Sequence, residues 1–259
     1  MLAAIFFIPS VAAIAQPATA PVARMLPGEM LKYEAKINKI IHGMPVADLT
    51  FSASGVTKSN QLVIRAEAVS KGTLLKLFRH SFLQQYESTV DLNTFRILKT
   101  DKHDVQKQRI RDSEAIFNYK DKRVNYTETV PNDPARPPRR IASAIGEQEH
   151  DMISAIYAVR LLPLYVGKRF ELSVSDSGLV YKIPFAVTGR EMQTTVLGHV
   201  WCFRVEPGIF GKGRLIGGEG KMVIWMTDDA RHLPVRSQIK TEFGKFDIKL
   251  KSVDSSGQF

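Results

Sequence analysis

Hydrophobic and polar residues alternate with a period of two along much of this chain, which is the pattern of β-strands that bury one face. The clearest stretch is residues 219–253, where three short alternating runs are separated by two polar segments, 227–231 and 243–245. Both segments carry residues that favour tight turns, such as paired aspartates and glycine. The pattern therefore predicts an antiparallel meander in this part of the chain.

Alternating runs recur elsewhere and predict further strands bounded by turn residues. The first two runs should form a hairpin that turns at His42 and Gly43. Mixed charge is dense between Lys99 and Arg123, which predicts that the strands within 95–130 are long, exposed and of the edge type. The expected strands are 31–37, 46–53, 61–69, 81–90, 95–99, 108–119, 123–130, 169–175, 179–190, 191–197, 200–206, 221–226, 234–242 and 245–253.

Three segments break the alternation. Residues 73–80 read TLLKLFRH and fit one short amphipathic helical turn better than a strand. Residues 131–149 contain four prolines and predict a loop that divides the chain into halves. Asp151 is a suitable N-cap and Pro163 a suitable stop, so we expect an α-helix over about 151–162. The expected fold is mainly β, a large curved antiparallel sheet or open half-barrel with one packed α-helix.

The start of the chain has the composition of an export signal. Residues 1–23 carry no charge, residues 2–8 form an apolar run, and Ala13 and Ala15 have the spacing of a cleavage site. The positively charged start of such a signal is missing, which leaves room for a start further upstream. A spanning helix is disfavoured, because the run is shorter than the ~20 residues that a bilayer requires and Pro9 interrupts it. The alternative is an apolar leader that packs on the domain.

This pattern sets the expected organisation and compartment. We expect a signal peptide or apolar leader at 1–23, a linker at 24–29, a single β-rich domain at 30–253 and a tail at 254–259. The expected location is the periplasm, reached through a Sec-type signal. The alternative is an N-terminal tether to the inner membrane.

The charge balance points to an anionic partner. The chain has 36 Lys and Arg residues against 26 Asp and Glu residues, a net charge of +10. In an exported protein this favours lipid headgroups or an acidic polysaccharide, and no nucleic acid is expected. Plain solubility is the alternative. The basic residues proposed for contact with an anion or a membrane surface are Lys76, Arg79, Arg136, Arg139 and Arg140, with Lys71 beside the first two.

Motifs with known chemistry are missing from the sequence. We find no Gly-x-Ser-x-Gly, phosphate-binding loop, HExxH or Cys-x-x-Cys, and no histidine pair has metal-ligand spacing, so we expect no catalytic residue, metal or cofactor. Cys202 is the single cysteine and is expected to be a small buried hydrophobe. An acid–base role is the less favoured interpretation of five residues that more readily serve as helix caps or turn residues: His150, Asp151, Asp228, Asp229 and His232.

Three segments, 151–191, 197–208 and 221–250, together carry a recognisable pattern. It consists of an Asp-initiated helix ending in Leu-x-x-Leu, a Gly-x-x-x-Cys strand, and a Trp-Met-Thr-Asp-Asp turn leading to Leu-Pro-Val. This pattern is similar to the bacterial family catalogued as domain of unknown function 3108, over roughly residues 28–253. The resemblance implies an exported, mostly β protein of the cell envelope. Its layout resembles the open half-barrels of periplasmic lipoprotein and lipid carriers, although no cysteine follows the leader to accept a lipid anchor.

The expected function is non-catalytic binding of an apolar or lipid-like ligand, or of an envelope partner, between the curved sheet and helix 151–162. A carrier of this kind predicts an elongated apolar cavity. The alternatives are an assembly or scaffold protein that uses edge strands within 95–130, and a hydrolase of envelope polymers. The oligomeric state stays open. The residues expected to line the ligand site are Ile153, Ile156, Tyr157, Leu161, Trp201 and Trp225.

Overall fold

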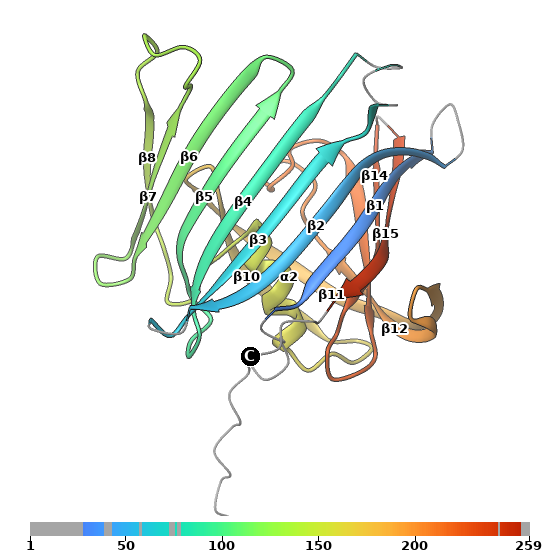
Figure 1. Ribbon diagram of the computed structural model, residues 1–259. Coiled ribbons are helices and arrows are strands. Elements are labelled where there is room, and N and C mark those ends of the chain that lie inside the picture. The colour runs from blue at the N-terminus through green and yellow to red at the C-terminus, as the bar shows by residue number, and fades with distance from the viewer. Residues whose placement is uncertain are drawn as a thin grey trace, which may run out of the picture.

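The computed structural model describes residues 28–38, 43–56, 59–72, 76, 79–242 and 244–254 (Figure 1). These residues form one sheet of fifteen strands and the helix α2 (Met152–Leu161). The strands are β1 (Met30–Asn38), β2 (Met44–Val56), β3 (Gln61–Ser70), β4 (Phe82–Asp91), β5 (Ile97–Gln106), β6 (Arg109–Asn118), β7 (Arg123–Thr129), β8 (Arg139–Ala144), β9 (His150–Asp151), β10 (Arg169–Asp176), β11 (Leu179–Thr195), β12 (Gly198–Pro207), β13 (Gly220–Thr227), β14 (Pro234–Thr241) and β15 (Gly244–Asp254). Within the described part of the chain, no helix is both long and apolar enough to cross a bilayer.

The sheet consists of two meanders joined at their middle. Strands β1 to β8 follow one another outward in chain order, and β9 to β15 return until β15 pairs with β1. The first and last strands therefore lie side by side in the centre, with Met30 opposite Asp254. All neighbours are antiparallel except the short pair of β9 with β10. The fold class expected from the sequence is confirmed.

The sheet curves until its two outer parts meet. The turn between β10 and β11 lies against β7 and β8, where Ser143 Oγ donates to the carbonyl oxygen of Gly178 at 2.6 Å. Gly178 has φ +80°, and a Cβ there would lie 2.7 Å from Cβ of Tyr126. Only glycine fits this contact without strain. The resulting interior holds α2, which Figure 1 shows behind the first meander.

Both ends of α2 are fixed by polar contacts. At its start, Asp151 Oδ1 accepts from Ser154 N at 2.7 Å, and Ser154 Oγ accepts from Asp151 N at 2.9 Å, which forms a capping box. The other carboxylate oxygen of Asp151 accepts from the hydroxyls of Ser88 on β4 and Thr100 on β5. The start of the helix is therefore tied to the middle of the first meander.

The far end of α2 is held by a buried ion pair. Arg160 and Glu29, each 1% exposed, form two parallel hydrogen bonds of 2.6 and 3.0 Å. Arg160 Nε also donates to the carbonyl oxygen of Arg231 at 3.2 Å, and the Tyr157 ring lies 5.1 Å from the guanidinium carbon. These contacts join α2, the residue before β1 and the turn between β13 and β14.

Several local predictions are confirmed. The helix expected at 151–162 is α2 with Asp151 as its N-cap, and the hairpin expected at 31–37 and 46–53 is β1 with β2. The helical turn expected at 73–80 falls mostly outside the described residues. So does the leader expected at 1–23, together with most of the linker at 24–29.

Three predictions about strands are wrong. The loop expected at 131–149 contains β8, because the prolines end before Arg139 and the backbone beyond them pairs with β7. The strands within 95–130 are not edge strands, since β5, β6 and β7 each pair on both sides and the edges are β8 and β9. The run at 191–197 is not a separate strand, because β11 continues through it to Thr195. Of the two edge strands, β8 is short and begins with two arginines, features that protect against edge-to-edge pairing.

We expect the substitution Arg160→Met to lower the free energy of unfolding by about 3–5 kcal/mol, because it leaves the Glu29 carboxylate buried without its partner. The control is Arg65→Met at the exposed pair with Glu87, which should cost at most about 1 kcal/mol. Chemical denaturation of both variants measures the difference. Equal costs for the two variants would contradict the assigned role of the buried pair.

Stability should also fall in acid through His150 of β9. This side chain is 3% exposed, and burial lowers its pKa from the usual 6.5 to about 4. The unfolded chain then binds the extra proton between about pH 6.5 and 4, so the free energy of unfolding should decrease as the pH falls through this window, by at most ~1.4 kcal/mol per pH unit.

The measurement is the unfolding free energy of His150→Gln and of the parent protein at several pH values. The variant should lose this part of the pH dependence. His199→Gln, on the exposed hairpin between β11 and β12, is the matched control and should keep it. A parent-like slope in His150→Gln would refute the assignment.

Candidate functional site

Helix α2 divides the interior into two apolar regions. Ile153, Tyr157 and Ala158 pack against the first meander, in a cluster that extends from β2 to β8. Ala155 and Val159 face the second meander and pack against β10 to β13. The helix therefore fills the middle of the interior.

A pocket remains between α2 and the second meander, with a volume of about 110 Å³. Every residue that lines it is apolar: Met152, Ala155, Ile156, Val159, Val174, Ile183, Phe185, Pro207, Ile209, Leu215, Met222, Ile224 and Met226. Met152 is 39% exposed and Ile156 is half-buried, so the pocket is accessible beside the first turns of the helix. This space lies to one side of α2, and it is not the elongated cavity expected of a carrier.

The segment between β12 and β13 covers part of this pocket. Ile209 and Leu215 line the pocket, and the segment is held in shape by a bridge between Phe210 and Ile216. Gly211 N donates to the carbonyl oxygen of Ile216 at 2.9 Å, which tightens the same turn. The segment between β12 and β13 is therefore held in its conformation by hydrogen bonds within itself.

The six residues predicted to line a ligand site do not come together. Ile156 lines the pocket, whereas Ile153, Tyr157 and Leu161 pack on the first-meander side of the helix. Trp201 is 45% exposed and lies under the guanidinium of Arg190, with 4.3 Å from ring centroid to guanidinium carbon. Trp225 is buried in a separate cluster with Cys202 and Leu250. The pocket is instead lined mainly by residues outside this predicted set, chiefly those on β10, β11 and β13.

Strand alternation explains why Trp225 is outside the pocket. Ile224 and Met226 line the pocket, so the side chain between them points to the opposite face of β13. There the guanidinium carbon of Arg236 lies 5.0 Å from the Trp225 ring centroid. Arg236 also forms two hydrogen bonds with Asp247, of 2.7 and 3.1 Å. Trp225 therefore supports the sheet and has no contact with the pocket.

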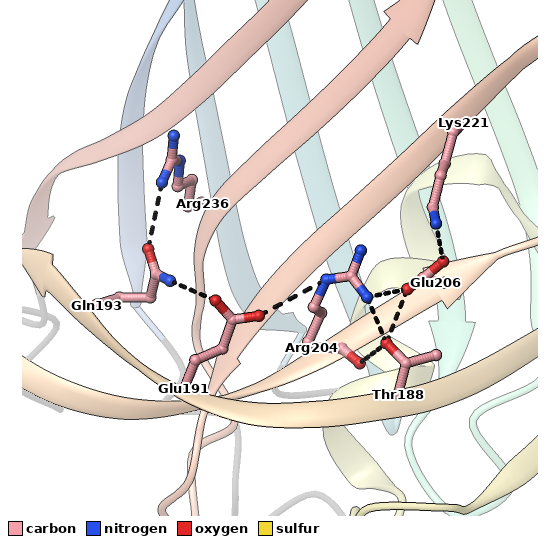
Figure 2. A network of polar contacts seen from close by, with 7 residues as sticks. All are labelled: Thr188, Glu191, Gln193, Arg204, Glu206, Lys221 and Arg236. Atoms are coloured by element: carbon pink, nitrogen blue, oxygen red, sulfur yellow. Dashed lines mark hydrogen bonds and ion pairs between the residues drawn. The ribbon is translucent and has the colours of Figure 1, made fainter.

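A network of polar side chains ties β11 to β14 on that same face (Figure 2). Glu206 accepts from Thr188 at 2.7 Å, contacts Arg204, and pairs with Lys221 at 2.8 Å. Burial by itself would raise the pKa of Glu206. The hydrogen bonds from Lys221 and Thr188 outweigh this effect and hold the pKa of Glu206 below its usual value. The network continues through Arg204, Glu191, Gln193 and Arg236. Because Arg204 and Glu206 alternate with the pocket-side cluster residues Phe203 and Val205, we assign this network a structural role.

A small polar pocket lies beside the start of α2. It has a volume of about 30 Å³ and includes Tyr86, Lys102, Asp151 and Asp176 in its lining. Burial lowers the pKa of Lys102, but Tyr86 and nearby carboxylates outweigh it, so the net shift is upward and the ammonium is retained. A space of this size holds about one water molecule. It has no room for a substrate beside these side chains.

The residues considered for acid–base chemistry lie at opposite ends of α2. His150 and Asp151 are at its start, where Asp151 is the N-cap. His232 is at its end, with Nδ1 3.1 Å from the carbonyl oxygen of Arg160, and Asp229 accepts hydrogen bonds within its own turn. Asp228 pairs with Arg190. A ten-residue helix is about 15 Å long, so these groups do not converge on one bound molecule.

Two further predictions concern Cys202 and the basic residues. Cys202 is fully buried, as expected, and burial raises the pKa of its thiol to about 11, so the thiol is protonated at neutral pH. The basic residues predicted to contact an anion are all exposed. They are Lys76 and Arg79, between β3 and β4, and Arg136, Arg139 and Arg140, between β7 and β8 or on β8 itself. Arg139 and Arg140 thus lie on a strand, not in the predicted loop.

Comparison with solved structures supports the fold. A crystal structure of a beta-barrel-like protein of the domain of unknown function DUF1849 from Brucella abortus matches with a TM-score of 0.60 and 10% identity, over 88% of this chain and 98% of that chain. A hypothetical protein from Chlamydia trachomatis aligns over 92% of this chain and 94% of its own, also at 10% identity, but its TM-score of 0.29 carries no argument. At such low identity the first likeness concerns the fold alone.

Comparison with protein sequences gives the family. None of the curated proteins matches this sequence. The family model for proteins of unknown function DUF3108 matches residues 32–251, which is most of the chain and includes every strand from β2 to β14. The resemblance noted in the helix, the Gly-x-x-x-Cys strand and the Asp-Asp turn is thereby confirmed. The chain belongs to the DUF3108 family.

Proposed function

We propose that this protein binds an apolar ligand in the pocket between α2 and strands β10 to β13, without catalysing a reaction on it. The observation that carries this proposal is the lining, which is apolar at every position although the pocket is accessible at Met152 and Ile156. An accessible apolar space is costly in water unless something fills it. A ligand that buries apolar surface there gains about 25 cal/mol per Å².

The size of the pocket limits what part of a ligand it takes. Its 110 Å³ is of the same order as the ~150 Å³ apolar cavity that binds benzene. The lining offers no charged or hydroxyl side chain, so a polar group placed inside would lose its hydrogen bonds to water. We therefore propose that a short aliphatic segment or a single ring enters, while any polar part of the ligand stays outside.

The lining combines fixed and adaptable side chains. Val174, Ile183 and Phe185 are held on paired strands, so their positions are set by the sheet. Met152, Met222 and Met226 bring three flexible thioether side chains to the same space. This mixture favours a class of apolar groups over one exact shape, as in a binding protein for lipid-like molecules.

We propose that this binding takes place in the periplasm. The support is the uncharged leader at 1–23 with its small-residue cleavage pattern. Envelope ligands with acyl chains would supply the apolar segment that the pocket accepts.

Filling the pocket should remove ligand binding. We expect Ile156→Trp to weaken the binding of an apolar fluorophore, N-phenylnaphthylamine, by roughly tenfold or more, because the larger side chain occupies the space that the ligand needs, and tenfold corresponds to ~1.4 kcal/mol. Ile116→Trp is the matched control, since Ile116 is 47% exposed on β6 and is not one of the residues that line the pocket. Fluorescence titration measures both variants.

Thermal unfolding of each variant checks that the fold is kept. Fluorophore affinity that is equal in Ile156→Trp, Ile116→Trp and the parent protein would refute the proposed site. Native mass spectrometry of the protein purified gently from its own cells then identifies the ligand, as a mass that is lost on denaturation and reduced in Ile156→Trp.

A further inference from the structure

One end of the first meander carries a concentration of exposed positive charge. We infer that this end docks on the surface of a bilayer that contains anionic phospholipids. The residues concerned, named here the basic rim, are Lys76, Arg79, Lys107, Arg109, Arg136, Arg139 and Arg140, and all seven are exposed. The inference does not depend on the apolar pocket.

The fold brings the basic rim together from three separate connections. Lys107 N, in the turn between β5 and β6, donates to the carbonyl oxygen of Ser81 in the connection that holds Arg79, at 3.0 Å. Asn132 Nδ2, in the connection between β7 and β8, donates to the carbonyl oxygen of Gln108 in that same turn, at 2.6 Å. The three connections are therefore neighbours in a continuous row at one end of the sheet.

The charge of the basic rim is not neutralised by ion pairs within the part of the chain that the structure describes. Apart from Lys71, which pairs with Glu34 and Asp48, residues 71–81, 106–109 and 130–140 hold the seven Lys and Arg residues of the basic rim and one acidic residue, Asp133. Among the described residues, no ion pair is formed by any member of the basic rim. On the strands between these connections the pattern is different: Lys99 pairs with both Asp101 and Glu114. Among the described residues, the members of the basic rim thus lack the carboxylate partners that Lys99 has.

The arrangement of the basic rim fits a surface better than a groove. It follows the ends of strands β3 to β8, and five inter-strand spacings of about 4.8 Å give a row of roughly 24 Å. This length is about three times the ~8 Å Debye length at physiological ionic strength, so a single small anion would interact with only part of the row. A partner must carry negative charge along the whole row to interact with every member of the basic rim. A headgroup layer provides such charge, and each basic residue near it contributes favourably.

The position of the apolar pocket agrees with an orientation in which the basic rim faces the bilayer. The segment between β12 and β13, whose Ile209 and Leu215 cover the pocket, joins strands at the same end of the sheet as the basic rim. The strand pairing shows this directly, because Gly220 at the start of β13 pairs with Thr241, and Lys245 at the start of β15 pairs with Asn38 at the end of β1. Docking would place this cover close to the lipids.

The test is co-sedimentation of the purified full-length protein with phosphatidylglycerol vesicles and with phosphatidylcholine vesicles. The parent protein should bind the anionic vesicles, and raising the salt concentration should release it. Reversing three charges together, Arg136→Glu, Arg139→Glu and Arg140→Glu, should weaken partitioning by ~100-fold or more, from the contribution of each basic residue near an anionic surface. Fluorophore binding to the apolar pocket should be unchanged in this variant, which separates the rim from the pocket.

The matched control reverses the same number of charges at the opposite end of the same strands. Lys120→Glu and Lys122→Glu change the turn between β6 and β7, and Arg123→Glu changes the first residue of β7. All three residues are exposed, and the triple variant should keep most vesicle binding. An equal loss in both triple variants would overturn the inference, because net charge alone would then explain binding. Absence of binding to phosphatidylglycerol, or tighter binding to heparin or duplex DNA at the same ionic strength, would overturn it as well.

Discussion

The buried ion pair of Arg160 and Glu29 is the contact on which the rest of the arrangement depends. Each side chain is 1% exposed, so neither charge has water as an alternative partner. Moving α2 by even a fraction of a turn would separate two charges in a medium of low dielectric constant, at a cost of several kcal/mol. The pair therefore fixes the end of α2 relative to β1, while the carbonyl oxygen of Arg231 ties the same guanidinium to the second meander.

The geometry of the apolar pocket follows from this constraint. Asp151 fixes the start of α2 to β4 and β5, so the helix is held at both ends from the first meander and from the residue before β1. The second meander must then curve around a helix whose position is already set. It contacts Ala155 and Val159 but does not fill the space beside these two residues and Ile156. The pocket thus lies beside a helix that is fixed at both ends, so the ligand proposed above would enter it with little rearrangement of the backbone.

Features that depend on residues close together in the chain could be predicted from the sequence, whereas features that depend on contacts between distant segments could not. The helix was predictable because Asp151 and Pro163 act within a few residues, and most strands were predictable from local alternation. Strand β8 was missed, since the prolines at 131–138 suggested a loop and its pairing partner β7 is set by the fold. The pocket was largely missed for a related reason. Alternation places Trp225 on one face of its strand and Ile224 and Met226 on the other, but it does not show which face contacts α2. The large aromatic side chain of Trp225 suggested that its face lines the ligand site, and this was wrong.

The same distinction explains why the basic rim was recognised only in pieces. Arg79 and Arg136 are far apart in the chain, and their proximity follows from four intervening strands that pair in order, β4 to β7. In a meander whose strands have similar lengths, every second connection lies at the same end of the sheet. Basic residues in these alternate connections therefore form one row of charge without contacting one another. The ion pair that stabilises α2 uses the residue before β1, at the opposite end of that strand from the connections that carry the rim. The buried ion pair and the basic rim therefore lie at opposite ends of β1, and no member of the rim takes part in the contacts that hold α2.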